Sequence, residues 1–178
     1  MNYELIDCNA EVLKNPILKF DFSNPPTDPI ELAHTLAEHM LKYNGMGLAA
    51  NQLGLPYRVF AIKANPIIVC FNPFIVDESE DTIYLDEGCL SYPGLMVKVK
   101  RPKTIKVRYT EPNGNVVTKT LDGLTSRIFQ HEFDHLNGIN FTKRANKIHL
   151  EQARNRLKSG KTPKSKNDMV TAYLSGVI

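Results

Sequence analysis

The sequence predicts an α+β fold in which antiparallel strands pack around a central helix that carries His131-Glu132-Phe133-Asp134-His135. An N-terminal helix and a basic C-terminal helix complete the expected fold. One helical pattern comes first, a block of strand-like segments and hairpins follows, and two more helical patterns close the chain. Helices grouped before and after the strands are typical of antiparallel α+β architectures. The 178 residues, 42% of them hydrophobic, suffice for one core and exclude wholesale disorder.

Each helix is predicted from apolar residues at helical spacing and from signals at its ends. The first begins at Pro29 after Asp28, a favourable cap, and ends before Asn44-Gly45. The second is expected at about 124–136 and ends before Asn137-Gly138. The third is expected at about 147–157, with Asn146 as its N-terminal cap.

The strand-like segments lie between the first two helices. Glu111-Pro112-Asn113-Gly114 is a turn signal between two such segments, which predicts a hairpin. The expected strands are 57–63, 67–71, 74–77, 96–99, 104–110 and 115–121.

Composition restricts the setting in which the protein works. No apolar run approaches the ~20 residues that a membrane span needs. The N-terminus has no basic-then-apolar signal pattern and no transit peptide. Three cysteines, an odd number, argue against a disulfide scaffold and favour a reducing compartment. We therefore expect a cytoplasmic protein without membrane association.

Charge divides the chain into two parts. Residues 1–142 hold 13 Lys and Arg against 17 Asp and Glu, whereas residues 143–178 hold nine against two. We therefore expect a catalytic domain at 1–142 and a basic C-terminal helix and tail at 143–178.

The sharpest chemical signal is the motif at residues 131–135. His131 and His135 are four residues apart, so one face of a helix presents both imidazoles to one metal ion. Glu132 lies beside the first histidine, where it can act on a metal-bound water without binding the metal. A surface helix that carries two histidines by chance is the less favoured interpretation.

A catalytic metal site also needs a third protein ligand. Downstream, His149 and Glu151 are poor candidates because they lie in the basic C-terminal part. Upstream, Cys89 stands in Glu87-Gly88-Cys89-Leu90-Ser91, and a thiolate is a strong ligand for Fe(II) or Zn(II). Taken alone, such a cysteine is more often a small buried apolar residue, as we assume for Cys8 and Cys70. Spacing by itself does not choose between these alternatives.

The segment Gly45-Met46-Gly47-Leu48-Ala49-Ala50-Asn51-Gln52 is the third signal. A helix end followed by small packing residues explains Gly45 but leaves Gln52 unexplained. Glycines and alanines at this density suit a place where an extended ligand lies against the backbone.

The three segments GMGLAANQ, EGCLS and QHEFDHLNG, in this order and at these separations, resemble the motifs of the peptide deformylases. The similarity runs over about residues 12–142. It implies a metal-dependent hydrolase that removes the N-formyl group from the initiator formyl-methionine of nascent polypeptides, a step of N-terminal methionine processing in protein biosynthesis. It also implies one divalent metal ion, usually Fe(II), with Zn, Ni or Co able to occupy the site, and a bacterial cytoplasm or that of a bacterial host.

The resemblance assigns roles to individual residues. Cys89, His131 and His135 would bind the metal, and Glu132 would take the proton from the metal-bound water that attacks the formyl carbon and deliver it to the leaving amine. The Gln52 side chain and the Leu90 N–H would hold the oxyanion. The residues expected to bind substrate are Gly45 and Gly47 along the peptide and Met46, Leu85, Leu124 and Ile128 around the methionine side chain. We further expect Arg101 to pair with Glu87 or Asp134 and so to orient the metal-bearing elements.

The chain departs from the family pattern at two positions near these motifs. Asn51 stands where the family often has proline or threonine, a change expected to alter loop rigidity more than chemistry. Met96 stands where many relatives carry an arginine that holds the substrate peptide, and Lys98 is a candidate replacement.

The basic C-terminal part admits two interpretations, a solvated tail or a docking element for ribosomal RNA. Two rival functions remain: another HExxH metallohydrolase such as a protease, and a retired deformylase fold that acts as a ribosome-binding factor. GMGLAANQ and EGCLS argue against the first, and the intact Glu132 argues against the second. The expected partners are nascent chains and, through the basic C-terminal part, the ribosome. We expect no DNA partner, and we favour a monomer.

Overall fold

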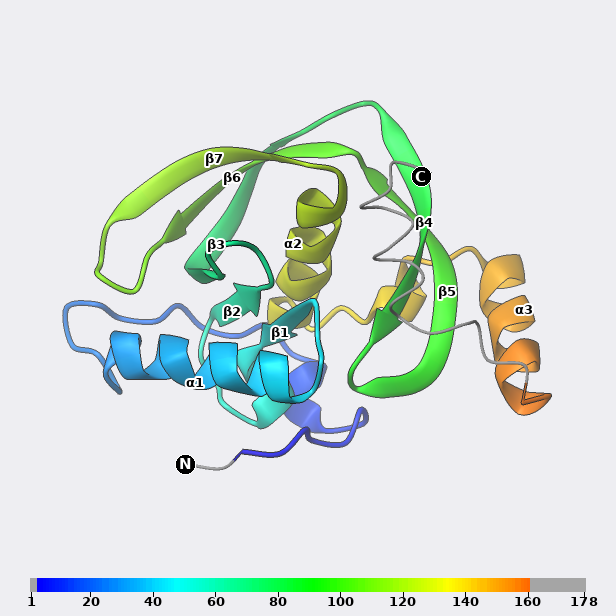
Figure 1. Ribbon diagram of the computed structural model, residues 1–178, viewed down its shortest axis with the longest axis horizontal. Coiled ribbons are helices and arrows are strands. Elements are labelled where there is room, and N and C mark those ends of the chain that lie inside the picture. The colour runs from blue at the N-terminus through cyan, green and yellow to red at the C-terminus, as the bar shows by residue number, and fades with distance from the viewer. Residues whose placement is uncertain (1–2, 161–178) are drawn as a thin grey trace.

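Figure 1 shows the computed structural model, which describes residues 3–160. Helix α2 (Gly123–Leu136) lies at the centre, with a curved antiparallel sheet on one side and a two-stranded ribbon on the other. Helix α1 (Pro29–Lys42) runs along the lower side, and α3 (Lys147–Lys158) stands beyond the ribbon. The α+β class predicted from the sequence is confirmed.

The larger sheet has five strands in the order β1-β2-β3-β6-β7, all antiparallel to their neighbours. Its strands are β1 (Gly47–Ala49), β2 (Val59–Ile62), β3 (Ile68–Glu78), β6 (Thr104–Thr110) and β7 (Val116–Asp122). The β6–β7 hairpin is confirmed. The segments expected at 67–71 and 74–77 form one strand, because the register shift between Phe71 and Phe74 interrupts the pairing without ending it.

The ribbon consists of β4 (Thr82–Cys89) and β5 (Tyr92–Pro102). Sequence reasoning found only 96–99 of β5 and missed β4. The exposure pattern of β4 explains the omission: most of its side chains are exposed or half-buried, so no apolar alternation marks it. The strand ends at Cys89, which brings that residue to the tip of the ribbon.

The core lies on both faces of β2, which is buried throughout. Phe60 and Ile62 pack toward α2, and Val59 and Ala61 pack toward α1. Phe60 meets Phe129 of α2 edge to face, with 5.0 Å between the ring centroids. This sandwich fixes the depth and the rotation of α2, and with them the direction of its histidines.

The helix ends follow the sequence signals. The Asp28 carboxylate accepts the Ile30 N–H at 2.8 Å, and Asn146 Oδ1 accepts the Ile148 N–H at 2.8 Å. Gly138 follows α2 with a positive φ of 68°. None of the helices within residues 3–160 has the length and apolar character needed to cross a membrane.

Helix α3 is attached through a small apolar contact. Its Ala153 is 3% exposed and belongs to a cluster with Val97 and Val99 of β5, against which Leu150 also packs. The same cluster contains Cys89, so the basic helix and the tip of the ribbon share one patch of core.

Candidate metal centre

Helix α2 places its motif residues in the interior. His131, Glu132 and His135 are 8%, 4% and 4% exposed, and the two imidazole rings lie 5.0 Å apart. Their spacing of four residues puts both rings on one side of the helix, as expected from the sequence. A buried imidazole needs a partner for each ring nitrogen, which makes this face of α2 a site rather than plain core.

Cys89 meets the two histidines from the tip of the ribbon. Its Sγ lies 3.2 Å from His135 Nε2, and the donor atoms of Cys89, His131 and His135 all lie within 4.8 Å of one another. Among residues 3–160 no other three His, Cys, Asp or Glu donors form such a group. The structure thus brings together the three residues expected to bind metal.

The other candidate donors lie elsewhere. His149 and Glu151 belong to α3, and the His149 ring meets Tyr84 of β4 edge to face. Cys70 is buried in the sheet, as assumed, whereas Cys8 is only partly buried. Of the candidates for a third ligand, Cys89 is therefore the one that the fold places beside both histidines.

Electrostatics favours a thiolate at Cys89. Burial alone would raise the pKa of its thiol, but the charges of His135 and His131 and their hydrogen bonds hold that pKa well below its usual range. The thiolate is the form of cysteine that binds metal ions.

Glu87 orients the first histidine. Its Oε2 is 3.0 Å from His131 Nδ1, which leaves His131 Nε2 as the nitrogen for a metal. Arg101 binds both Glu87 oxygens, at 2.6 and 2.9 Å, and Arg127 binds Oε1 at 2.7 Å. Burial disfavours the charge on Glu87, but Arg101 and His131 nevertheless hold the pKa of its carboxyl well below the usual range.

Arg101 extends the same network to Asp134. Its Nη1 donates to Asp134 Oδ2 at 2.7 Å, so Arg101 pairs with both carboxylates that the sequence offered as alternatives. Arg144, just before α3, also binds Asp134, with Nη2 to Oδ1 at 2.6 Å and Nε to Oδ2 at 3.1 Å. The metal-bearing helix is thereby tied to the ribbon and to the C-terminal part of the chain.

Sequence reasoning missed the contributions of Arg127 and Arg144. Arg127 lies four residues before His131 and is 5% exposed. An arginine one helical turn before a candidate ligand, on its face, was a usable signal. Arg144 had no such signal, because in the sequence it is one of several neighbouring cations, and nothing distinguishes it from Lys143 and Lys147, which are exposed.

The glycines of GMGLAANQ lie against the other two motifs. A Cβ on Gly47 would overlap the Glu132 carboxylate, and a Cβ on Gly45 would come within 2.9 Å of Leu90 Cδ1. These glycines are required because Glu132 and Leu90 approach the backbone too closely for a side chain.

Gln52 connects the first motif to the second. It sits in a short 3-10 turn, Ala50–Leu53, and is 2% exposed. Its Oε1 accepts the Ala49 N–H at 2.9 Å, while its Nε2 donates to Ser91 Oγ at 3.1 Å and lies 3.6 Å from Cys89 Sγ. The Gln52 amide nitrogen therefore faces the metal centre.

Asn51 connects the first motif to the third. Its Nδ2 donates to the His135 carbonyl at 2.7 Å in a fully buried position, and its Oδ1 is buried with no hydrogen-bond partner among the described residues. The orientation of the amide is unambiguous, because the opposite one would place two oxygens together. The departure at position 51 is thus a structural tie to the end of α2.

The residues expected around the methionine side chain are divided between two places. Ile128 belongs to the core cluster of α2, and Met46 and Leu124 pack against that cluster. Leu85 lies on β4 opposite Val99 of β5 and is half-buried.

Met96 and Lys98, both on β5, have different surroundings. Met96 is half-buried, and its sulfur lies against Gly88, next to Cys89. Lys98 is exposed, opposite Asp86 on β4.

Glu132 is a buried carboxylate beside the candidate metal ligands. Its Oε2 is buried with no hydrogen-bond partner among the described residues. Burial raises the pKa of its carboxyl, against the opposing pull of His131 and His135. An unengaged buried carboxylate beside two imidazoles and a thiol is poised to exchange a proton.

The chemistry of the donors fits a metal ion. Two imidazole nitrogens and a low-pKa thiol, each buried, form a three-ligand set of the kind found in catalytic sites, and Glu132 adds an unused carboxylate beside it. Fold and site together define a mononuclear metallohydrolase centre carried on a helix.

Comparisons with known proteins give the family. A family model described as polypeptide deformylase matches residues 2–151. The peptide deformylase of Aquifex aeolicus is 38% identical over 162 residues, covering 85% of this chain and 94% of that protein. The peptide deformylase of Thermotoga neapolitana is 41% identical over 125 residues, covering 70% and 73%. A crystal structure of a peptide deformylase from Synechococcus elongatus in complex with actinonin matches with a TM-score of 0.80 at 31% identity, over 88% of each chain. The chain belongs to the polypeptide deformylase family.

Proposed function

We propose that this chain removes the N-formyl group from the initiator formyl-methionine of nascent polypeptides. The observation that carries the proposal is the convergence of three distant segments on one buried centre. Gln52 comes from the first, Cys89 from the second, and His131, Glu132 and His135 from the third. A chance HExxH helix would not be met by the other two segments.

Cys89, His131 and His135 would hold one divalent ion, for which we propose Fe(II), with Zn, Ni or Co accepted by the same donors. Bound there, the ion supplies a Lewis acid that polarises the formyl oxygen and lowers the pKa of water. Glu87 keeps His131 in the tautomer that presents Nε2.

Glu132 is the proposed general base and acid. It takes a proton from the water that attacks the formyl carbon and delivers it to the amine that leaves. Its buried, unpartnered Oε2 and raised pKa support this role, because a carboxylate engaged in strong hydrogen bonds would be a weaker base.

Gln52 and the Leu90 N–H are the proposed donors to the developing oxyanion. Gln52 is held by its contacts with Ala49 and Ser91, so its amide is already oriented toward Cys89. Preorganised donors of this kind need no reorganisation during the reaction.

The substrate backbone would lie along β1. This strand is at the edge of the five-stranded sheet and pairs only with β2, so its other side is available to an added strand. Gly45 and Gly47 flank Met46 there, and we propose that the methionine side chain enters the apolar region that Met46, Leu124 and Ile128 share beside α2. Leu85, on β4, is not part of that cluster.

The test is release of formate from a formyl-Met tripeptide by protein loaded anaerobically with Fe(II). We expect turnover by the natural chain and a loss of about 10²–10⁴-fold in the Glu132→Gln variant with metal content unchanged. Glu31→Gln, an exposed change of the same kind on α1, is the control. Absence of formate from fully metallated protein would reject the proposal, and cleavage of the unformylated tripeptide would favour a protease.

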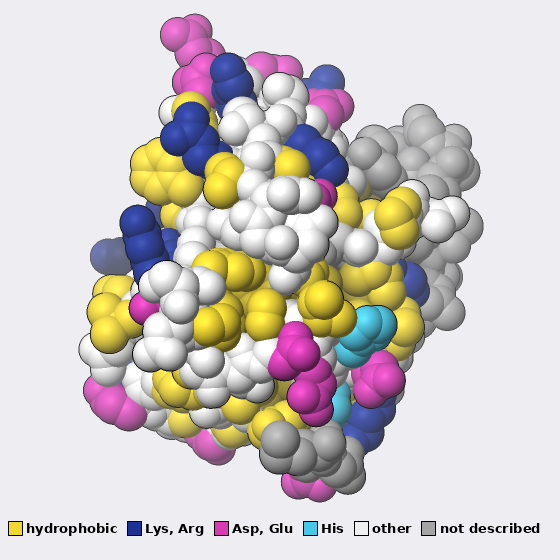
Figure 2. Space-filling view, turned by 90° about the vertical axis from the view of Figure 1, so that its left-hand side faces the viewer, with side chains coloured by type: hydrophobic (Ala, Val, Ile, Leu, Met, Phe, Trp, Pro, Cys, Tyr) yellow, Lys and Arg dark blue, Asp and Glu magenta, His cyan; other side chains and the backbone are white. Residues whose placement is uncertain are grey.

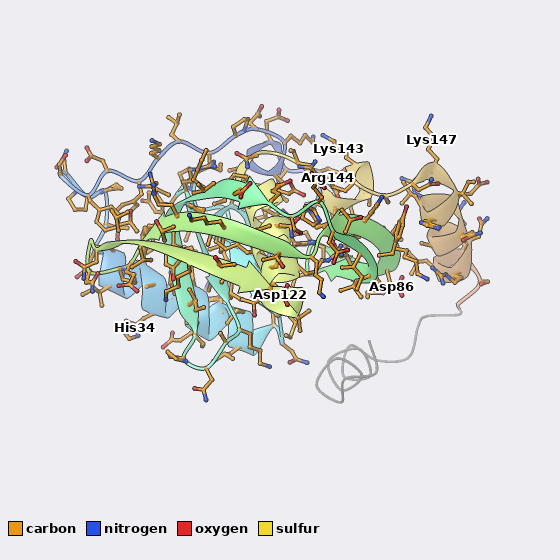
Figure 3. The ribbon with its side chains drawn as sticks, turned by 90° about the horizontal axis from the view of Figure 1, so that it is seen from above. His34, Asp86, Asp122, Lys143, Arg144 and Lys147 are labelled. Carbon is orange, nitrogen blue, oxygen red and sulfur yellow. The ribbon has the colours of Figure 1, made fainter. Side chains whose placement is uncertain are left out.

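We also propose that α3 contacts ribosomal RNA, which would place the protein in the cytoplasm where translation supplies its substrate. Lys147, Arg154, Arg156 and Lys158 are exposed and form no ion pair within the described part of the chain. Lys147 points away from the body in Figure 3. Unpaired cations on one element are the electrostatic footprint of nucleic-acid binding.

Substitution tests this contact better than truncation, because Ala153 and Leu150 pack against the ribbon. Replacing Lys147, Arg154 and Arg156 by serine should weaken cosedimentation with ribosomes and reduce its salt dependence, while activity on a short formyl peptide stays unchanged. Serine at Lys63 and Lys106, two exposed cations of the body, is the control. Equal binding by both variants would reject the contact.

A further inference from the structure

A groove in the surface of the molecule lies outside the metal centre. It has a volume of about 640 Å³ and lies between the segment 17–19, the middle of β3 and the adjoining ends of β6 and β7. Its volume falls within the range of about 300–1,000 Å³ that ligand pockets occupy. None of the residues assigned to the metal centre lines it.

The groove gathers exposed apolar side chains. Leu18, Val116 and Phe74 are 85%, 66% and 60% exposed, among the highest values for large hydrophobic residues in the described chain, and all three line this groove. Figure 2, which views the molecule from its left-hand side, shows hydrophobic and basic side chains next to one another at the surface. Single exposed apolar residues are ordinary, but several in one hollow mark an interaction site.

The charged residues of the groove all have the same sign. Lys19, Arg58 and Arg108 line it, no acidic residue does, and none of the three forms an ion pair within residues 3–160. This is notable because residues 1–142 as a whole hold more acidic than basic side chains. Locally unbalanced positive charge on an acidic body attracts a negatively charged partner.

One cation of the groove is rigidly placed. Arg58 Nη1 donates to the carbonyls of Leu136, at 3.0 Å, and Ile17, at 3.3 Å, and its Nη2 donates to Asn137 Oδ1 at 3.1 Å. These are neutral acceptors, and the guanidinium also lies over the Phe133 ring, 5.5 Å from its centroid, so Arg58 is fixed in position while no described carboxylate pairs with its charge.

The wall at 17–19 also offers free main-chain groups. The Ile17 N–H is bound to the Leu136 carbonyl at 2.9 Å, and Phe20 N–H to Asn72 Oδ1 at 2.8 Å, so both ends of the segment are pinned. Between them, the main chain of Leu18 and Lys19 makes no hydrogen bond to any described residue. Successive residues of an extended chain direct their N–H and C=O groups to opposite sides, so an added strand would pair with the main chain of one of the two residues.

We propose that this groove binds an extended acidic peptide segment of a partner protein. The peptide would pair its main chain with Leu18 or Lys19, place carboxylates near the cations and lay apolar side chains against Phe74 and Val116. A nucleic acid fits less well, because Phe74 is the single exposed aromatic ring that lines the groove and the unpaired main chain matches a peptide.

The experiment measures fluorescence anisotropy of a dye-labelled decapeptide of alternating glutamate and leucine, titrated with the full chain. We expect saturable binding that weakens as salt rises and at least tenfold weaker binding of a decapeptide with lysine in place of glutamate. The double variant Lys19→Glu/Arg108→Glu should weaken binding at least tenfold. Val116→Ser, which keeps all charges, should weaken it severalfold.

Lys106→Glu is the matched control, since Lys106 is exposed on β6 two residues from Arg108 but does not line the groove. It should change binding less than twofold. All variants are surface changes remote from the metal ligands, so unaltered circular dichroism and unaltered activity on a short formyl peptide show that they are folded. No saturable binding, or equal weakening by Lys106→Glu, would overturn the proposal. Tighter binding of a uridine decanucleotide than of the acidic peptide would also overturn it.

Discussion

The metal centre and helix α3 are both rich in charge, but they use it in opposite ways. Around the metal centre, Glu87 and Asp134 are 5% and 3% exposed, and every one of their oxygens is bound by an arginine or a histidine. On α3 the cations are exposed and unpaired among the described residues.

This difference determines what each region requires of its side chains. A buried charge is costly unless its particular partner is present, so identity and geometry matter at each position. A surface charge contributes mainly to the net field, so position matters little and sign matters most. Substitutions of similar chemistry should therefore have very unequal effects in the two regions.

The largest effect is expected for Arg101→Met. The variant removes the cation shared by Glu87 and Asp134 and leaves Glu87 with Arg127 and His131 alone. Breaking a buried pair in this way costs about 3–5 kcal/mol, to be measured as the free energy of unfolding in urea. The neighbouring Lys100→Met, an exposed change of the same chemistry on β5, should cost less than about 0.5 kcal/mol. Equal losses in the two variants would contradict the comparison.

A smaller effect is expected for Asn51→Leu, which keeps the side-chain volume but removes the hydrogen bond to the His135 carbonyl. We expect the free energy of unfolding to fall by about 1–2 kcal/mol. The substitution also removes the buried, unpartnered Oδ1, and this offsets part of the cost of losing the hydrogen bond. Because Asn51 adjoins Gln52, kcat should fall while KM stays nearly constant.

Asn51→Thr is the comparison for that change, since its hydroxyl keeps a hydrogen-bond donor at this position, although one bond closer to the backbone than the Asn51 amide nitrogen. It should retain kcat within about a few-fold. If both variants lose kcat equally, the hydrogen bond is not what positions the Gln52 turn.

Arg144→Gln tests where the boundary between the two regions lies. By sequence Arg144 belongs to the basic C-terminal part, but by contact it belongs to the metal centre through Asp134. Its side chain is 47% exposed and Asp134 keeps Arg101, so we expect a loss of only about 1 kcal/mol in thermal or urea unfolding. Lys143→Gln, exposed and unpaired within the described chain, should leave stability unchanged. If Arg144→Gln leaves the free energy of unfolding unchanged, Arg144 belongs with the C-terminal part, and the boundary between the two regions stays at residue 142.

The same contrast explains how much the sequence could predict. Helix ends depend on local signals such as Asp28, Asn146 and Gly138, and they were predicted to within a residue or two. Strand β4 was missed because its side chains are mostly exposed or half-buried and its pairing partner lies across a turn.

For the site, the i, i+4 spacing was sufficient to pair His131 with His135, since a helix fixes their geometry. The choice of Cys89 needed the resemblance, because its approach depends on ribbon topology rather than on local pattern. Ties such as Asn51 to His135 join residues 84 positions apart and leave no local signal at all.

The smallest effects are expected at the two ends of α3, where they should have opposite signs. The positive end of the helix dipole lies near Lys147, in the first turn, and the negative end near Lys158, in the last turn. Lys147→Ser should therefore raise the free energy of unfolding and Lys158→Ser should lower it, each by less than about 0.5 kcal/mol. Both shifts should shrink in thermal unfolding at high salt, because these side chains are exposed and screened. Shifts of the same sign, or shifts unaffected by salt, would mean that the lysines make specific contacts, as the charges around the metal centre do.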